Sequence, residues 1–133
     1  MFTLIQSSPL EITLDPVSTE ERLSSVAFDI TAKWTMPYQN AQIVVKECWF
    51  EYSELNNFEV ELKQLINRQI DDLKFNNMSL EPIMVFRRNN EKFSFEFLAI
   101  DSSNIGIASI KTNLFEQELI EITQNVRNWS KWW

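Results

Sequence analysis

Glycine, cysteine and histidine are nearly absent from this chain of 133 residues, which contains one glycine (Gly106), one cysteine (Cys48) and no histidine. Without histidine there is no Ser-His-Asp or Cys-His nucleophile and no zinc site with an imidazole ligand. One glycine is too few for a GxGxxG loop, a P-loop or a GxSxG turn, because each needs several positions that exclude a Cβ. These absences exclude the commonest nucleotide-binding and hydrolase designs.

Basic residues and long apolar runs are also scarce. Twelve Lys and Arg stand against nineteen Asp and Glu, a net charge of −7. Phosphate backbones require clustered cations, so this balance disfavours nucleic acid as the main ligand and suits a basic protein partner, or simply solubility. No run approaches the roughly 18 apolar residues that span a membrane, and residues 1–10 lack a basic signal segment. We therefore expect a cytoplasmic protein.

The remaining composition predicts one folded domain. Apolar residues make up 44% of the chain and charged residues 23%, far from a disordered composition. A chain of this length buries roughly two-thirds of its unfolded surface and needs no disulfide or metal. No linker or low-complexity tract divides it. We predict a single α+β domain over residues 1–133.

Alternating apolar and polar residues predict strands that form a mainly antiparallel sheet of about six to seven strands. Residues 10–14 are bracketed by Pro9 and Pro16. Residues 41–52 change phase, which predicts either a bulge near Lys46–Glu47 or a strand buried on both faces. Asparagines are expected to take the turn positions that glycine usually occupies. The predicted strands cover residues 10–14, 26–36, 41–52, 83–87, 92–100 and 105–111.

Apolar residues three and four apart predict two amphipathic helices packed on the sheet, at about residues 56–75 and 113–131. Asn56 and Asn113 are the predicted caps. Residues 58–62 (FEVEL) and 115–119 (FEQEL) share a pattern 57 positions apart. This similarity indicates either a duplicated strand–helix unit or, our preferred interpretation, the usual start of an amphipathic helix.

Candidate chemistry is confined to carboxylates and one thiol. Asp71 and Asp72 are adjacent, so on a helix they diverge by about 100° and cannot share a proton. A run of five acids, from Glu47 to Glu61, lacks the spacing of a calcium loop and is expected to be a solvated surface. Cys48 is expected to be an inert packing residue. We predict no catalytic residue, no metal and no cofactor.

Two surfaces are candidates for partner binding. The first is acidic and comprises Glu51, Glu54, Glu59 and Glu61. The second is the aromatic C-terminus, Trp132 and Trp133, where Trp132 lies about 100° from the apolar stripe of the last helix. Phenylalanines at 93, 95 and 97 alternate and are expected to form the buried face of a strand.

Several short motifs, in order over about residues 28–100, resemble the WapI-like immunity proteins of bacterial polymorphic-toxin and contact-dependent competition systems. They match the family's D-x-x-A-x-W stretch, its F-E and E-L-x-x-L segments, its L-E-P turn and the strand after it. The matching residues are Asp29–Trp34, Phe50–Glu51, Glu61–Leu65, Leu80–Pro82 and Val85–Phe86.

The resemblance implies a small α+β domain without catalytic activity that binds and neutralises a cognate toxin domain. It transfers no binding residues, since the shared positions Trp34, Phe50, Leu62 and Leu65 are expected in the core. The leading hypothesis is thus a cytoplasmic immunity protein that binds its partner through an acidic surface. The alternative is a structural module that self-associates as a homodimer through exposed aromatic surface, with no toxin partner.

Overall fold

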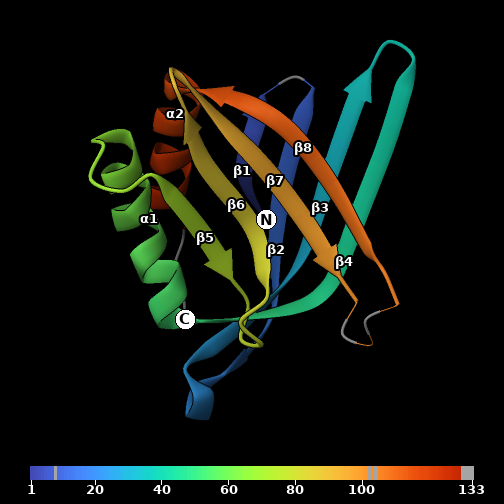
Figure 1. The fold of residues 1–133 in the computed structure, drawn as a ribbon. Helices are drawn as coiled ribbons and strands as arrows, with labels where there is room; N and C mark the ends of the chain where they lie inside the picture. The colour runs from blue at the N-terminus through green and yellow to red at the C-terminus, as the bar shows by residue number, and fades with distance from the viewer. Residues whose placement is uncertain (8, 102, 104, 130–133) are drawn as a thin grey trace.

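The computed structural model describes residues 1–7, 9–101, 103 and 105–129. It confirms an α+β domain with two helices (Figure 1). The elements in chain order are β1 (Phe2–Ser7), β2 (Leu10–Glu20), a 3₁₀ helix η1 (Glu21–Leu23), β3 (Ser25–Met36), β4 (Gln39–Glu51), α1 (Tyr52–Ile66), β5 (Asp72–Asn76), β6 (Pro82–Asn89), β7 (Lys92–Ile100), β8 (Ile107–Phe115) and α2 (Glu116–Arg127).

The strands form two sheets, where the sequence predicted one sheet of six or seven strands. Each sheet is a four-stranded antiparallel meander, with the orders β1-β2-β3-β4 and β5-β6-β7-β8. Helix α1 follows the first meander and α2 follows the second, so the described chain repeats one element order, four strands and a helix. The first strand, β1, is absent from the sequence prediction.

The repeated string of the sequence does not mark this repeated order. Phe58 is the seventh residue of α1, whereas Phe115 is the N-cap of α2. The two strings therefore occupy different places in their helices. Their similarity reflects the pattern of an amphipathic helix, while the duplication exists at the level of element order.

Each helix packs against the first strand of the other half of the chain. Helices α1 and α2 lie side by side, α1 along β5 and α2 along β1 (Figure 1). The side chain of Asn125 donates to the Leu4 carbonyl of β1 at 3.0 Å, and the Asn76 N–H of β5 donates to Glu54 Oε1 of α1 at 3.0 Å. The helices thus cover one edge of each sheet, and β4 and β8 form the opposite edges.

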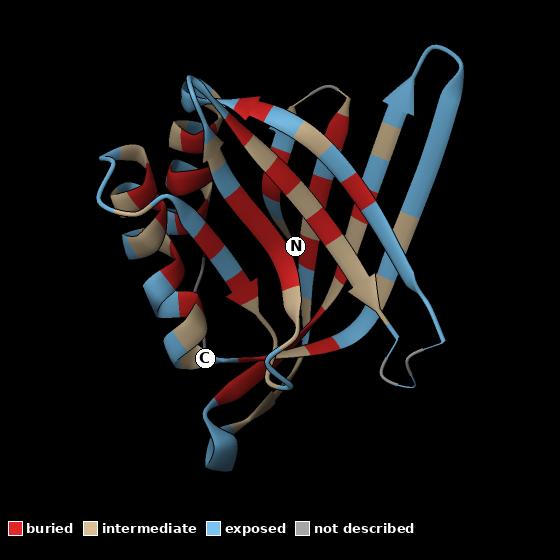
Figure 2. Cartoon of the chain, viewed as in Figure 1, coloured by how far each residue is buried: buried red, intermediate tan, exposed pale blue. Residues whose placement is uncertain are grey.

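One core joins both sheets and both helices, as the buried inner faces in Figure 2 show. The alternating phenylalanines Phe93, Phe95 and Phe97 are all buried, which confirms the predicted strand face. Within the core, the Phe75 ring of β5 stacks between Phe50 of β4 and Phe58 of α1, with centroid distances of 4.6 and 4.4 Å. This aromatic stack connects the two halves of the chain.

The predicted helix over residues 56–75 is wrong at both ends. Helix α1 begins at Tyr52 with Glu51 as N-cap, so Asn56 lies inside the helix. It ends at Ile66, and Arg68 adopts a left-handed conformation (φ 63°). After this turn Leu73 and Phe75 alternate with exposed residues in β5. Apolar residues of this short strand happen to continue the three- and four-residue spacing of the helix, so the sequence pattern predicted a helix that is too long.

The predicted helix over residues 113–131 is also longer than α2. Asn113 lies in β8, and the N-cap is Phe115, whose N–H donates to Glu118 Oε1 at 3.1 Å. Trp129 is buried and stacks on Phe2 at 5.5 Å. Trp132 and Trp133 lie outside the described residues.

Strand β2 continues through Pro16, which was expected to end it. The partner strand β1 pairs only as far as Leu14, so beyond that point β2 is an edge on one side. A proline without an N–H is tolerated at such a position. The register shifts between Pro16 and Ser18, which marks a bulge.

The predicted bulge near Lys46–Glu47 is confirmed. The register of β3 and β4 shifts opposite Asp29, and Glu47 has a φ of 50°. Asp29 Oδ1 accepts the Glu47 N–H at 2.9 Å, and its Oδ2 lies 3.2 Å from Lys46 Nζ. The Glu47 N–H and then Lys46 lower the pKa of the Asp29 carboxyl. One carboxylate therefore stabilises the bulge.

We expect Phe75→Ala to lower the free energy of unfolding by about 3–5 kcal/mol, because it leaves a cavity between Phe50 and Phe58. The matched control is Phe115→Ala, since that ring is 55% exposed. It should cost about 1 kcal/mol or less. Urea denaturation monitored by circular dichroism measures both, and equal losses would contradict the role given to the stack.

Candidate functional site

Three segments meet at the end of the molecule where η1 lies (Figure 1). The Tyr52 N–H, at the start of α1, donates to the Ser24 carbonyl beside η1 at 2.8 Å. The Met78 N–H, in the loop between β5 and β6, donates to the Trp49 carbonyl of β4 at 2.8 Å. These two hydrogen bonds hold η1, the β4–α1 junction and the β5–β6 loop together.

The β5–β6 loop is organised by one asparagine. Asn77 Oδ1 accepts the N–H groups of Ser79 and Glu81 at 3.0 and 2.9 Å, and its Nδ2 donates to Glu81 Oε1 at 3.0 Å. Leu80 has a φ of 61° and is 82% exposed. Asn77 thus shapes this loop through its side chain, while the left-handed position is taken by Leu80. The expectation that asparagine takes the turn positions of glycine is therefore wrong for this loop and is confirmed at Asn90, which has a φ of 58°.

Carboxylates gather at this end. Five carboxylates and one guanidinium lie on the three segments, and each is exposed or half-buried. We call this group the acidic end. It consists of Glu20, Glu21, Arg22, Glu51, Glu54 and Glu81.

The acidic end borders an apolar hollow of about 420 Å³. Its lining includes Leu23 of η1, Trp49 of β4 and Met78 of the β5–β6 loop, with Glu20 at its margin. Leu23 is 62% exposed. Among the described residues, the carboxylates of the acidic end form no ion pair. An apolar hollow next to such carboxylates is suited to an apolar side chain carried by a positively charged protein surface.

The four acids predicted as one surface are divided by the structure. Glu51 and Glu54 belong to the acidic end. Glu61 lies two turns beyond Glu54 on the same face of α1, and burial, followed by repulsion from Glu54, raises the pKa of its carboxyl. Glu59 faces α2, and its Oε1 lies 2.8 Å from Nε of Arg127 on that helix. The same oxygen lies 3.2 Å from Nζ of Lys63, one turn further along α1. Its charge is therefore compensated within the fold.

Three acids of this end were missed from the sequence. Glu20 and Glu21 are brought beside Glu51 because β3 pairs with β4 through Ser25 and Glu51. Glu81 is brought there by the Met78 hydrogen bond of its loop. The adjacent acids Glu20 and Glu21 are visible in the sequence as a local negative charge. Their position beside Glu51 could not be predicted, because it depends on the register of the whole β3–β4 pair.

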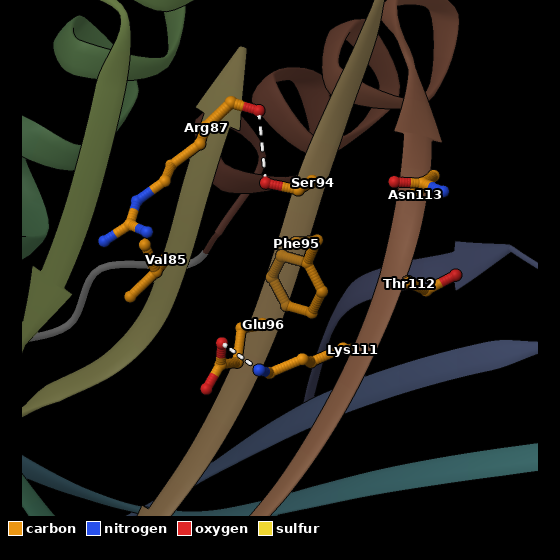
Figure 3. A pocket seen from close by; sticks show the side chains of 8 residues that line it. All are labelled: Val85, Arg87, Ser94, Phe95, Glu96, Lys111, Thr112 and Asn113. Carbon is orange, nitrogen blue, oxygen red and sulfur yellow. Dashed lines mark hydrogen bonds and ion pairs between the residues drawn. The ribbon is translucent and has the colours of Figure 1, made fainter. Parts of the chain in front are cut away.

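The outer face of the second sheet has the opposite charge. It presents four cations and two anions, with Lys111 Nζ 3.6 Å from Glu96 Oε2. Figure 3 shows the polar hollow on this face, where Ser94 Oγ donates to the Arg87 carbonyl at 3.5 Å. The charged residues, placed by strand register, are Asp72, Lys74, Arg87, Lys92, Glu96 and Lys111. The molecule is therefore polarised, with its excess negative charge elsewhere.

The one thiol has the properties of a packing residue. Cys48 is 6% exposed. Burial, and to a smaller extent the charge of Glu81, raise the pKa of its thiol to about 12 against the lowering effect of a hydrogen bond with Asn77. The thiol is therefore protonated at neutral pH, and nucleophilic chemistry needs the thiolate.

The described part of the chain contains no group of three or more His, Cys, Asp or Glu side chains arranged to hold a metal ion. Within the same residues, no helix is both long and apolar enough to cross a membrane. The acidic end therefore remains the candidate site.

Comparison with protein-family models, curated proteins and solved structures found no match to this chain. The positions shared with the WapI-like pattern are mainly structural here. Phe50, Leu62 and Leu65 are fully buried, as expected, while Trp34 is half-buried. Asp29, the acid of the first motif, holds the bulge of β4.

We expect Glu59→Gln to lower the free energy of unfolding by about 0.5–1 kcal/mol at pH 7, a small value because Arg127 and Lys63 are about half exposed. The hydrogen bond from Arg127, and then Lys63, lower the pKa of Glu59 below its usual 4.5. The stabilisation is thus present above pH 4.5 and disappears as the pH falls through the lowered value.

The measurement is urea denaturation of both proteins at pH 7 and pH 3. Glu121→Gln, an exposed acid on α2, is the matched control and should have little effect at either pH. A difference between wild type and Glu59→Gln that persists unchanged at pH 3 would rule out the ion pairs as its cause.

Proposed function

We propose that this protein is a non-catalytic binding protein, a cytoplasmic immunity protein that neutralises a cognate toxin domain through the acidic end. The observation that carries the proposal is the apolar hollow at the junction of η1, β4 and the β5–β6 loop, which Glu20 lines and whose neighbouring segments carry the other carboxylates of the acidic end. The resemblance to WapI-like immunity proteins supplies the class of partner.

The physical basis for binding lies in the two kinds of surface that meet there. Exposed carboxylates without an internal counter-ion attract a basic partner over several ångströms and accelerate encounter. The hollow lined by Leu23, Trp49 and Met78 supplies the apolar contact that determines how long the complex lasts. The outer face of the second sheet carries a net positive charge and repels a basic partner. This repulsion favours approach of the partner at the acidic end.

Rigidity at this end favours recognition of a defined partner. The β5–β6 loop is held by three hydrogen bonds of the Asn77 side chain and by the Met78 hydrogen bond to β4. Few side-chain and loop conformations have to be ordered on binding, so less conformational entropy is lost.

Co-expression tests the proposed function. The toxin partner is the C-terminal domain of a large secreted protein encoded beside this gene, and cells that produce this domain alone should stop growing. Cells that also produce this protein should grow. Equal growth arrest with and without the protein would overturn the proposal.

Charge replacement tests the assigned surface. We expect Glu20→Gln/Glu21→Gln/Glu51→Gln to raise the Kd for the same toxin domain at least about tenfold at low salt and to flatten its salt dependence. Glu54 and Glu81 are left unchanged because their carboxylates hold the Asn76 N–H and the Asn77 side chain. Glu20 Oε1 accepts the Arg22 N–H at 3.1 Å, and the amide oxygen of glutamine can accept the same hydrogen bond. Isothermal titration calorimetry at two ionic strengths measures both effects.

The matched control is Glu11→Gln/Glu116→Gln/Glu121→Gln, which changes the net charge equally at exposed positions on β2 and α2. It should shift the Kd by no more than about threefold. Equal effects of the two triple variants would assign binding to net charge and remove the acidic end as the site.

A further inference from the structure

The hairpin formed by β3 and β4 projects beyond the body of the molecule. Figure 1 shows it extending past the second sheet, and Figure 2 shows that its outer part is mostly exposed. Its outer part, from Trp34 to Val45, is the longest run without a charged residue in the sequence. At its turn, Tyr38 is 99% exposed.

One face of this hairpin is apolar except at Gln39, which lies opposite Met36 near the turn, and it continues the core into solvent. Strand register places Ile43 opposite the buried Ala32, and Ala41 opposite Trp34. Three residues of this face are partly buried against the core, whereas Met36 is 42% exposed and Ala41 is exposed. We call this face the apolar row. It consists of Trp34, Met36, Ala41, Ile43 and Val45.

The part of β4 near α1 is protected against pairing with another chain. The bulge at Glu47 interrupts the strand, and the Met78 N–H occupies the Trp49 carbonyl. Charges, bulges and covering loops are the devices by which proteins protect edge strands.

The outer part of β4, residues 39–45, has none of these protections. It contains no proline, charged residue or bulge. Strand β4 is the edge of its sheet, and in the described part of the chain no strand pairs with its free side. Unpaired backbone groups and an uncovered apolar row therefore coincide.

We propose that β4 pairs antiparallel with β4 of a second copy, about a two-fold axis at Ile43. This register places Ile43 opposite Ile43 and Ala41 opposite Val45 of the second copy, so the apolar rows of both chains join. The β1–β4 sheet of one copy and the β1–β4 sheet of the second copy then form one continuous sheet. Pairing satisfies backbone groups of both edges and buries apolar surface that the single chain leaves exposed.

The outer edge of β4 is self-complementary, which favours a second copy as the occupant, because Ala41, Ile43 and Val45 meet the same three residues of the other chain about the axis. Two chains with a net charge of −7 repel each other, so they associate best through a surface that carries no charge. Residues 39–45 provide that surface. In the proposed register Asn40 lies opposite Lys46 and Gln39 opposite Glu47, so no like charges face each other directly. The contact is small, and we expect a Kd on the order of micromolar.

Sedimentation equilibrium over a range of concentrations, up to about tenfold above the expected Kd, tests the proposal. The wild type should pass from 15.8 kDa to twice this mass. Ala41→Glu should raise the dimer Kd at least about tenfold, because each new carboxylate lies opposite Val45 of the second copy and interrupts the joined apolar rows. Since Ala41 is exposed, its replacement should leave the circular dichroism spectrum unchanged.

Ala108→Glu is the matched control, because Ala108 is likewise an exposed alanine on an edge strand, β8. Its dimer Kd should stay within about twofold of the wild type. A monomer at every concentration, an unchanged Kd for Ala41→Glu, or a larger effect of Ala108→Glu would each overturn the proposal. Toxin binding should be unaffected by Ala41→Glu, so this test is independent of the acidic end.

Disulfide cross-linking tests the register. In the Cys48→Ala background, Ile43→Cys should form a covalent dimer under mild oxidation, because only the residue on the axis faces itself across antiparallel strands. Val44→Cys, one residue off the axis, should cross-link much less. A stronger cross-link through Val44→Cys would overturn the assigned axis.

Discussion

The fold depends on the way each helix covers the first strand of the other half. An antiparallel meander leaves two edges unpaired, and exposed edges invite pairing with other chains. Helix α1 lies along β5 and α2 along β1, and side-chain hydrogen bonds such as Asn125 to Leu4 reinforce this cover. Both helices lie on the same side of the molecule and cover the β1 and β5 edges there. The opposite edges, β4 and β8, are consequently left to other means of protection.

The inner and outer parts of the β4 edge differ in how they are protected. Near α1, the Asp29 carboxylate stabilises the Glu47 bulge and the Met78 N–H binds the strand. The same Met78 hydrogen bond fixes the β5–β6 loop against β4, and the Tyr52 N–H joins the start of α1 to Ser24 beside η1, so the two bonds assemble the acidic end. Protection of the inner part of β4 and formation of the candidate site are therefore one arrangement. The outer part of β4, beyond the bulge, lacks such contacts.

Sequence periodicity predicted what depends on local pattern. It identified the strand face of Phe93 to Phe97, the bulge at Glu47 and the two amphipathic helices, because neighbouring residues determine each of these. It misplaced the end of α1, since Leu73 of a short strand fits helical spacing. The acidic end was found only in part. Glu51 and Glu54 are close in sequence, whereas Glu20 and Glu81 reach them through strand register and a loop hydrogen bond.

The distribution of charge separates the two proposed interactions in space. A toxin domain recognised by carboxylates requires the exposed Glu20, Glu21 and Glu51 at the end where η1 lies. A second copy with the same net charge requires a surface without carboxylates, and the longest one in the sequence lies on the β3–β4 hairpin. Because the Glu47 bulge marks the boundary between these regions, a dimer joined through the outer part of β4 leaves both acidic ends exposed. Such a dimer presents two copies of the acidic end, the surface proposed to bind the toxin domain.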